Sequence, residues 1–382
     1  MEKMGERSMR RHEALLTVIN LYIIVFTVPF FYSPLTMRDS ASIVRQISLG
    51  CSEGGKTFEF DEQHDRTKPI RTWFQESTDG LVLFIVFYSQ ACRWSRCLGC
   101  NLPSTCSQFP VNYRDILKQI DAVIADPEVQ EKRWNVRKLI VSNNGSILDQ
   151  TTFSSTALIY LVLQANLHFP NLSVFSIETR VEYVEVEELE FLARAIGEGD
   201  SPTELELAVG FEAFDDRIRN DVMKKGLSKR VFETFVEKVA RYRFRLKCYL
   251  MQKPVPGMTD EEGVRDIHDA IDYLSTLSKT CTAADEPPVR IGIHVNPTYA
   301  AKGTLLEKAL RNGTYAPPNL HDVARAVLYA EGSPLSVFIG LSDEDLAIPN
   351  GSFIRAGDEE ILKELEAFNR TQNYNLLRAI TT

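Results

Sequence analysis

The stretch that decides the fold is Leu81-Val-Leu-Phe-Ile-Val-Phe-Tyr88, which is followed closely by Ala91-Cys-Arg-Trp-Ser-Arg-Cys-Leu-Gly-Cys100. The first run is strongly apolar and rich in β-branched and aromatic residues, which predicts a strand. The second run places Cys92, Cys97 and Cys100 in a polar loop after that strand. Thiolates at this spacing can converge on one metal centre, whereas buried structural cysteines have no reason to cluster beside arginines. We therefore expect the three cysteines to be metal ligands.

From residue 81 to about residue 300, short apolar runs alternate with longer runs of helical periodicity. The predicted strands cover 81–88, 138–142, 173–178, 204–211, 244–251 and 289–295. The predicted helices cover 114–125, 155–167, 186–196, 216–225, 229–242 and 262–277. Repeated βα units with right-handed crossovers give an α/β fold, here an open partial (β/α)6 barrel. Functional groups of such sheets lie at the carboxyl ends of the strands, where the cysteine loop also lies.

The two ends of the chain differ from this repeat, and we expect three regions. Residues 1–48 form a leader, residues 49–300 the barrel, and residues 301–382 a small C-terminal α+β extension. Helices are predicted in the extension over 305–311, 320–330 and 358–368, with a strand over 336–339. The leader carries a basic start and the apolar run Leu15–Tyr32. We favour an over-extended start of a cytoplasmic protein, and a membrane anchor through residues 13–35 is the alternative.

Composition limits the class of protein. Of the 382 residues 44% are hydrophobic, which is enough for a large core, and the formal charge of −9 argues against a broad nucleic-acid-coating surface. Arg241, Arg243, Arg245 and Lys247 alternate along the chain, and we expect one solvated face rather than a phosphate contact. Seven cysteines, of which four are scattered, fit a reducing compartment better than a secreted disulfide framework.

The cysteine spacing alone leaves several interpretations open. Cys106 completes the pattern C-x4-C-x2-C-x5-C, which would suit a structural zinc in a non-catalytic interaction protein. A two-iron centre shares the first part of the pattern, and three unligated thiols are a further alternative. The remaining interpretation is a [4Fe–4S] cluster held by three thiolates, which leaves one iron open for an exchangeable ligand.

A three-cysteine loop after the first strand of a partial barrel resembles the radical S-adenosylmethionine (SAM) superfamily. The usual spacing there is C-x3-C-x2-C, so this chain has one additional residue in the first gap. Later segments resemble the branch of the Elongator catalytic subunit and, more closely, the archaeosine-biosynthesis lyase group. They are Ser142–Asp149, Ile177–Arg180, Val209–Asp216, Tyr249–Gly257, His294–Thr298, Gly303–Glu307 and Tyr315–Pro318.

The resemblance implies that Cys92, Cys97 and Cys100 hold a [4Fe–4S] cluster and that SAM binds beside it. The SAM contacts that we expect are Asn144, Gly145, Ser146, Glu178, Arg180, Glu212, Met251, His294 and Asn296. Glu178 and Arg180 are two residues apart, so on a strand they share a face and can hold opposite ends of a zwitterion. Simpler roles stay open: a turn at 143–146, a Glu178–Arg180 ion pair, a helix cap at Glu212, and packing roles for Met251 and His294.

The resemblance further implies reductive cleavage of SAM to a 5′-deoxyadenosyl radical, with tRNA nucleoside modification of the archaeosine lyase type as the specific version. Such an enzyme needs an electron donor such as ferredoxin or flavodoxin. A partner protein would supply affinity for tRNA, since this chain is acidic. The sequence identifies neither the substrate nor the oligomeric state.

Overall fold

The computed structural model describes residues 40–281 and 287–381, of which those from Val44 onward belong to one compact unit. The apolar run Leu15–Tyr32 lies outside the described residues. Within the described ranges, no helix is both long and apolar enough to cross a membrane. The division of the chain at residues 48 and 300 stays a prediction.

One eight-stranded sheet forms the framework, with the strands in chain order from β1 to β8. The strands are β1 (Arg71–Ser77), β2 (Gly80–Val86), β3 (Val136–Ser142), β4 (Val174–Glu178), β5 (Glu204–Glu212), β6 (Arg245–Gln252), β7 (Ile291–Pro297) and β8 (Ser336–Ile339). Strands β2 to β8 pair in parallel, and β1 pairs antiparallel with β2. The six predicted parallel strands are confirmed, and the predicted strand of the extension joins the same sheet. The sheet is therefore a curled half-barrel, as the partial-barrel prediction requires.

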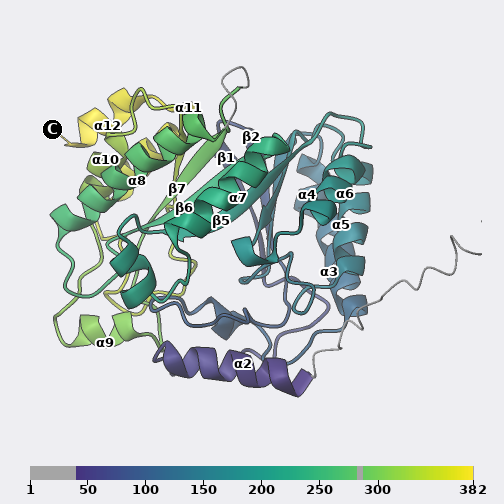
Figure 1. Cartoon of the computed structure of the whole chain (residues 1–382), viewed down its shortest axis with the longest axis horizontal. Coiled ribbons are helices and arrows are strands. Elements are labelled where there is room, and N and C mark those ends of the chain that lie inside the picture. The colour runs from purple at the N-terminus through teal and green to yellow at the C-terminus, as the bar shows by residue number, and fades with distance from the viewer. Residues whose placement is uncertain (1–39, 282–286, 382) are drawn as a thin grey trace, which may run out of the picture. The chain divides into compact units, whose positions relative to one another are not determined.

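Helices follow the strands as the repeat predicted, and Figure 1 shows α3, α5 and α6 side by side along one part of the sheet. The helices are α2 (Ser40–Glu53), α3 (Tyr113–Ala125), α4 (Pro127–Lys132), α5 (Ser155–His168), α6 (Val186–Ile196), α7 (Lys229–Arg241), α8 (Asp260–Thr280), α9 (Leu305–Arg311), α10 (Leu320–Leu328), α11 (Glu359–Thr371) and α12 (Tyr374–Thr381). The sequence did not predict α2, α4 and α12. Helix α8 begins with a capping box in which Thr259 and Glu262 satisfy each other's backbone N–H groups.

The predicted helix over 216–225 is wrong in type and length. It is a wide π-helical turn, Arg217–Val222, in which the Arg219 side chain is fully buried. The guanidinium donates to the carbonyl oxygens of Ala213 and Leu227, at 2.5 and 2.7 Å. These internal acceptors hold the side chain under the turn, a constraint that helical periodicity does not reveal.

Along each strand, side chains point alternately toward the surrounding helices and toward the inside of the half-barrel. On β5, Leu205, Leu207 and Val209 face the helices and belong to the main hydrophobic core. The intervening Glu206 and Gly210 face the inside of the half-barrel, because successive side chains point to opposite faces. The barrel interior is therefore lined by the even-numbered positions of β5, and these positions carry the polar chemistry.

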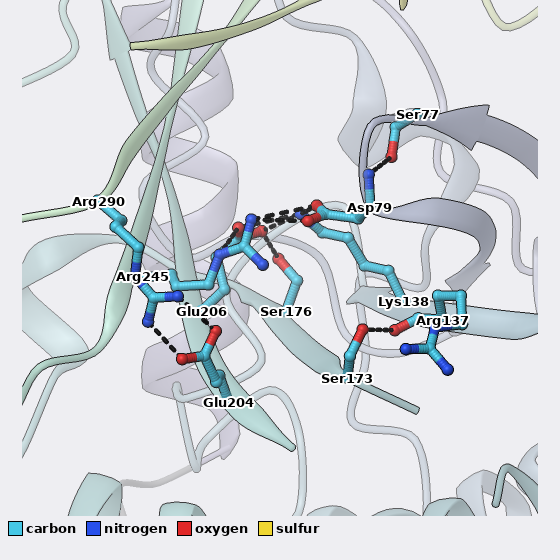
Figure 2. A network of polar contacts seen from close by, with 10 residues as sticks. All are labelled: Ser77, Asp79, Arg137, Lys138, Ser173, Ser176, Glu204, Glu206, Arg245 and Arg290. Atoms are coloured by element: carbon cyan, nitrogen blue, oxygen red, sulfur yellow. Dashed lines mark hydrogen bonds and ion pairs between the residues drawn. The ribbon is translucent and has the colours of Figure 1, made fainter. Parts of the chain in front are cut away.

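At the amino-terminal ends of the strands, this interior holds a closed network of charges (Figure 2). Lys138 Nζ lies 2.9 Å from Asp79 and 2.8 Å from Glu206, and Arg245 donates to Asp79 at 2.9 Å. Ser176 donates to Glu206 at 2.7 Å. We call Asp79, Lys138, Glu206 and Arg245 the basal network.

The predicted solvated face over 241–247 is wrong for two of its residues. Arg245 is a member of the basal network, and Lys247 is buried in the barrel interior. Burial lowers the pKa of Lys247 to about 8, with Lys138 adding repulsion. Both residues occupy positions of β6 whose side chains point into the barrel. The predicted alternation along the strand was therefore correct, but the shared face meets the barrel interior and not solvent.

Candidate active site

A cavity of about 740 Å³ opens at the carboxyl ends of the strands. This volume is within the roughly 300–1,000 Å³ of small-molecule sites. Eight of the nine predicted cofactor contacts line it: Asn144, Gly145, Glu178, Arg180, Glu212, Met251, His294 and Asn296. The ninth, Ser146, is buried behind the wall, where its Oγ accepts a hydrogen bond of 3.1 Å from the backbone N–H of Arg180. The structure thus gathers segments that are about 150 residues apart in the chain.

The cysteine loop borders this cavity through Gly145. A Cβ at Gly145 would stand 3.3 Å from the Cα of Cys92, so the glycine allows the two loops to approach closely. Cys92, Cys97 and Cys100 are partly buried free thiols. Burial raises the pKa of the Cys97 thiol, and nearby Lys225 and Arg180 act in the opposite direction.

The residue types around the three thiols suit an anionic centre. Burial raises the pKa of Cys100 to about 11, against which the ammonium of Lys56 favours the thiolate. Lys56 Nζ is itself buried and has no hydrogen-bond partner within the described part of the chain. A group carrying negative charge beside Cys100 would supply that partner. Three thiolates with cationic side chains around them therefore fit the donor set of an iron–sulfur cluster.

The four residues between Cys92 and Cys97 attach the loop to its surroundings. Arg93 forms a buried two-contact ion pair with Asp149, with distances of 2.5 and 2.7 Å. Trp94 donates from its indole nitrogen to the carbonyl of Lys224 at 2.7 Å, and its ring lies 4.5 Å from the Arg180 guanidinium. Ser95 takes the left-handed conformation, at a φ of 46°, and closes the turn. The additional residue in this gap is thus accommodated by a tight turn between well-anchored neighbours.

The end of α2 packs against the same loop, a contact that the sequence did not predict. A Cβ at Gly50 would lie 2.4 Å from the carbonyl oxygen of Trp94, and one at Gly54 would lie 2.8 Å from that of Arg96. These distances are shorter than any side chain tolerates, so both positions require glycine. The spacing of four residues between Gly50, in α2, and Gly54, which directly follows the helix, was the available signal.

Glu178 and Arg180 do not pair with each other, so the simpler ion-pair interpretation is wrong. Tyr249 donates its hydroxyl to Glu178, whereas Arg180 contacts Glu182 at 2.5 Å and donates to the carbonyl of Lys225 at 2.9 Å. Burial raises the pKa of Glu178. The two side chains line different parts of the cavity, with Arg180 on the side of the cysteines.

Glu212 is engaged by an ammonium group from its own chain. Lys225 Nζ lies 2.6 Å from its carboxylate, and both side chains line the cavity. Glu212 itself has a φ of 70° at the end of β5, where the pairing with β6 shifts register. The helix-cap interpretation is not borne out, because Asp215 and Ser228 accept from backbone N–H groups of the following segments instead.

His294 lies between two aromatic rings, 4.9 Å from Tyr249 and 4.8 Å from Phe338. Burial lowers its pKa well below the ordinary value, which keeps the imidazole neutral. Asn296 follows on the same face, with its Oδ1 at Gly340. Met251 both lines the cavity and packs on Met223, Val255 and Met258, so it has the packing role as well.

Many cavity residues were missing from the sequence-based set, among them Lys225, Tyr249 and Glu344. Tyr249 has the same strand parity as Met251 and was therefore within reach of the alternation rule. Lys225 follows the π-helical turn. Glu344 lies in the segment after β8, at a φ of 57°, and no periodicity marks either position.

Cys106 does not join the other three cysteines. Its buried thiol lies 3.7 Å from the carbonyl oxygens of Leu102 and Asn143, and burial raises its pKa to about 12. Within residues 40–281 and 287–381, no three His, Cys, Asp or Glu side chains are arranged to hold a single metal ion. The four-cysteine zinc site therefore has no evidence in its favour, and the same finding applies to the set Cys92, Cys97 and Cys100.

Comparison with known proteins gives relatives along most of the chain, while no family model matches it. Archaeosine synthase subunit beta of Methanosarcina acetivorans is 26% identical over 304 residues, 76% of this chain and 79% of that protein. An uncharacterised protein of Methanocaldococcus jannaschii is 23% identical over 327 residues, 82% of this chain and 84% of that protein. A queuine lyase from Clostridium spiroforme, solved with SAM and queuine, is 17% identical, with coverages of 73% and 98% and a TM-score of 0.47.

The chain is thus similar over most of its length to proteins named archaeosine synthase subunit beta. This similarity agrees with the sequence resemblance to the archaeosine-related group.

Proposed function

We propose that Cys92, Cys97 and Cys100 hold a [4Fe–4S] cluster and that the adjoining cavity binds SAM. The observation that carries this proposal is a cavity lined by eight predicted contact residues, one of which, Gly145, packs against Cys92 of the cysteine loop. When bound, the cluster supplies the electron that cleaves the carbon–sulfur bond of SAM, which is chemistry that the protein itself cannot provide.

The residues of the chain would position SAM by complementary charge. Arg180, held beside Trp94 on the cysteine side, offers a guanidinium for the carboxylate of the methionyl part. Asn144 and Gly145 offer short polar groups and open backbone next to Cys92, with Ser146 fixing the backbone of Arg180 from behind. Glu178 and Glu212 provide acceptors for ammonium or hydroxyl groups, and Met251 an apolar surface for the adenine. His294 and Asn296 complete the wall on β7.

For the overall reaction we propose modification of a tRNA nucleoside by lyase chemistry of the archaeosine type. The relatives named archaeosine synthase subunit beta support this version. Their names also support a partner subunit, which would supply RNA affinity to a chain with a formal charge of −9. A small electron-transfer protein such as ferredoxin or flavodoxin would be the reductant.

Two measurements test the proposal at its two levels. Iron and sulfide analysis of anaerobically reconstituted protein should give about four of each per chain, whereas one zinc would contradict the cluster. Mass spectrometry of tRNA nucleosides from cells with and without the gene should show one modified nucleoside replaced by its precursor. Unchanged nucleosides would exclude the tRNA substrate but leave the cluster and SAM cleavage standing.

A further inference from the structure

Most of the basic side chains around the cysteine loop are paired with a carboxylate of the protein. The pairs are Arg93–Asp149, Arg96–Glu53, Arg180–Glu182 and Lys225–Glu212. Lys56 differs, because its Nζ has no hydrogen-bond partner among the residues that the structure describes. The positive charge of Lys56 is therefore left uncompensated by the described part of the chain.

The Lys56 side chain is also buried in an unusual way for a lysine. A surface lysine covers apolar neighbours with its stem and keeps its ammonium group in water. Here the residue as a whole is half-buried, while Nζ itself is shielded from solvent. Nζ lies 5.6 Å from the ring centroid of Phe58, which offers no conventional hydrogen-bond acceptor. Burial of an ammonium group without acceptors costs free energy, so this position is favourable only with a ligand that supplies them.

The local backbone directs Lys56 at the cysteine loop. Its N–H donates to the carbonyl oxygen of Cys51 at 3.0 Å, just after the end of α2. A Cβ at Gly54 would lie 3.2 Å from the Cε of Lys56 and 2.8 Å from the carbonyl oxygen of Arg96. Because Gly54 has no side chain, the stem of Lys56 can pass beside Arg96, the residue that precedes Cys97.

The charge of Lys56 acts mainly on the Cys100 side of the loop. Burial raises the pKa of the Cys100 and Cys51 thiols, and Lys56 is the strongest influence in the opposite direction at both. At Cys97 the corresponding cation is Lys225, which is already paired with a carboxylate. The uncompensated positive charge is thus placed beside Cys100.

We propose that the Lys56 ammonium group is the charge partner of the iron–sulfur cluster on the Cys100 side and raises its reduction potential. The proposal rests on the proposed function, since it assumes a cluster on the three cysteines. Net charge and hydrogen bonds to the sulfurs set the potential of such clusters. Reduction adds one electron from the reductant and makes or breaks no bond. A fixed positive charge that is shielded from water favours the more negative, reduced form, so a milder donor can reduce the cluster.

The test compares the wild type with Lys56→Met, which keeps an unbranched stem and removes the charge. The midpoint potential of the reconstituted cluster is measured in the full-length protein, without SAM, by a redox titration followed by EPR. At a fixed potential the variant should have an about tenfold lower ratio of reduced to oxidised cluster, which is a shift of about 59 mV to more negative values for one electron. An unchanged potential in a variant with wild-type iron content would overturn the proposal.

Two further variants separate the charge from its surroundings. Lys56→Arg keeps the charge and should stay closer to the wild-type potential than Lys56→Met. Lys302→Met is the matched control, because Lys302 is exposed and precedes Gly303, whose carbonyl oxygen accepts from the N–H of Thr57 at 2.9 Å. Water and salt screen an exposed charge, so Lys302→Met should leave the potential unchanged. Equal shifts in Lys56→Met and Lys302→Met would contradict the proposal, since net charge alone would then explain them.

A second measurement does not require the cluster. In the cluster-free protein the ammonium group of Lys56 has no acceptor, so Lys56→Met should unfold at a higher denaturant concentration than the wild type. In the reconstituted protein, the same variant should lose iron to a chelator faster than the wild type. A cluster-free Lys56→Met protein that is no more stable than the wild type would contradict the proposal, because Lys56 would then be compensated within the chain.

Failure of this proposal can be distinguished from failure of the proposed function. If the wild type forms no iron–sulfur cluster, the proposed function fails and the role of Lys56 fails with it. If the wild-type cluster forms and cleaves SAM, and Lys56→Met has the same potential, only the role of Lys56 is refuted.

Discussion

The two ends of the barrel interior are built from the same kinds of side chain, but they differ in how completely the charges are paired. In the basal network, Lys138 and Arg245 face Asp79 and Glu206 (Figure 2), and only about 40 Å³ of space remains beside them. At the mouth, around a cavity of about 740 Å³, Glu344 forms no ion pair and His294 Nδ1 no hydrogen bond with the residues that the structure describes. The basal end is complete as a structure, whereas the mouth has groups that a ligand would satisfy.

The pKa directions follow this contrast. Burial alone would raise the pKa of Glu206, but Lys138 and Arg245 outweigh it and the pKa is lowered. For Glu178 and Glu344, burial prevails and the pKa is raised. Charges that are paired within the fold contribute stability, and charges that wait for a ligand reduce it.

The largest effect is expected at the cysteines. Cys92→Ser, Cys97→Ser and Cys100→Ser should each abolish both the visible absorption of the cluster and SAM cleavage, since a serine is no substitute for a soft thiolate ligand. Cys106→Ser is the matched control, and it should retain both because its thiol faces backbone carbonyls. Loss of the cluster in Cys106→Ser alone would show that the ligand set has been assigned wrongly.

A large loss of stability is expected in the basal network. Glu206→Gln leaves Lys138 and Arg245 with one carboxylate between them, and breaking such a buried set costs about 3 kcal/mol in the free energy of unfolding. Glu204→Gln, which removes an exposed partner of Arg290, should cost less than about 1 kcal/mol. Denaturant titration at pH 7 measures both.

The same two variants should also differ in how their free energy of unfolding depends on pH. Because the folded pKa of Glu206 lies below its ordinary value of 4.5, the wild type has this stability above that pH and loses it as pH falls further. Similar losses in Glu206→Gln and Glu204→Gln would show that charge pairing does not hold the basal end together.

At the mouth, removal of a charge should stabilise the free protein. Burial and repulsion from Glu178 and Asp343 raise the pKa of Glu344 to about 7, against the attraction of Arg71. Between pH 4.5 and 7 the folded state therefore keeps a proton that the unfolded state has released, and wild-type stability falls as pH rises. Glu344→Gln should be more stable than the wild type by ~1–2 kcal/mol at pH 8 and equal to it at pH 4. A variant less stable at pH 8 would mean that Glu344 is already compensated.

The smallest effect is expected at the anchor of the cysteine loop. Trp94→Phe keeps a ring over Arg180 but removes the hydrogen bond to the carbonyl of Lys224, which is worth about 1 kcal/mol. The protein should still form its cluster, and the cluster should be lost faster in air because the loop opens more readily. If the cluster of Trp94→Phe lasts as long in air as that of the wild type, the Trp94 hydrogen bond does not hold the loop closed. The buried Arg93–Asp149 ion pair would then be the anchor.

Much of this fold was predictable because apolar periodicity reports directly on burial. The six parallel strands and the helices between them follow from it, and so does the placement of the cysteine loop at a strand end. Strand β1 was missed because Arg71, Gln75 and Glu76 make it a half-exposed edge strand, although the following Asp79-Gly80 is a typical hairpin signal.

The site was predictable only where residues follow strand ends. Asn144, Glu178 and Glu212 each end a strand or lie next to its end, and the parallel sheet brings such positions together. Glu344 and Lys225 come from irregular segments whose course depends on the completed fold. The inward direction of Lys247 was likewise hidden, because alternation defines two faces but does not say which one meets solvent.

In the function proposed above, the three cysteines and the cavity beside them form one SAM-cleaving site. The most direct test is anaerobic reconstitution with iron and sulfide, followed by addition of SAM and dithionite and quantification of 5′-deoxyadenosine. We expect reductant-dependent formation of 5′-deoxyadenosine in the wild type and none in Cys97→Ser. A wild-type protein that carries the cluster, binds SAM and releases no 5′-deoxyadenosine with reductant would contradict it.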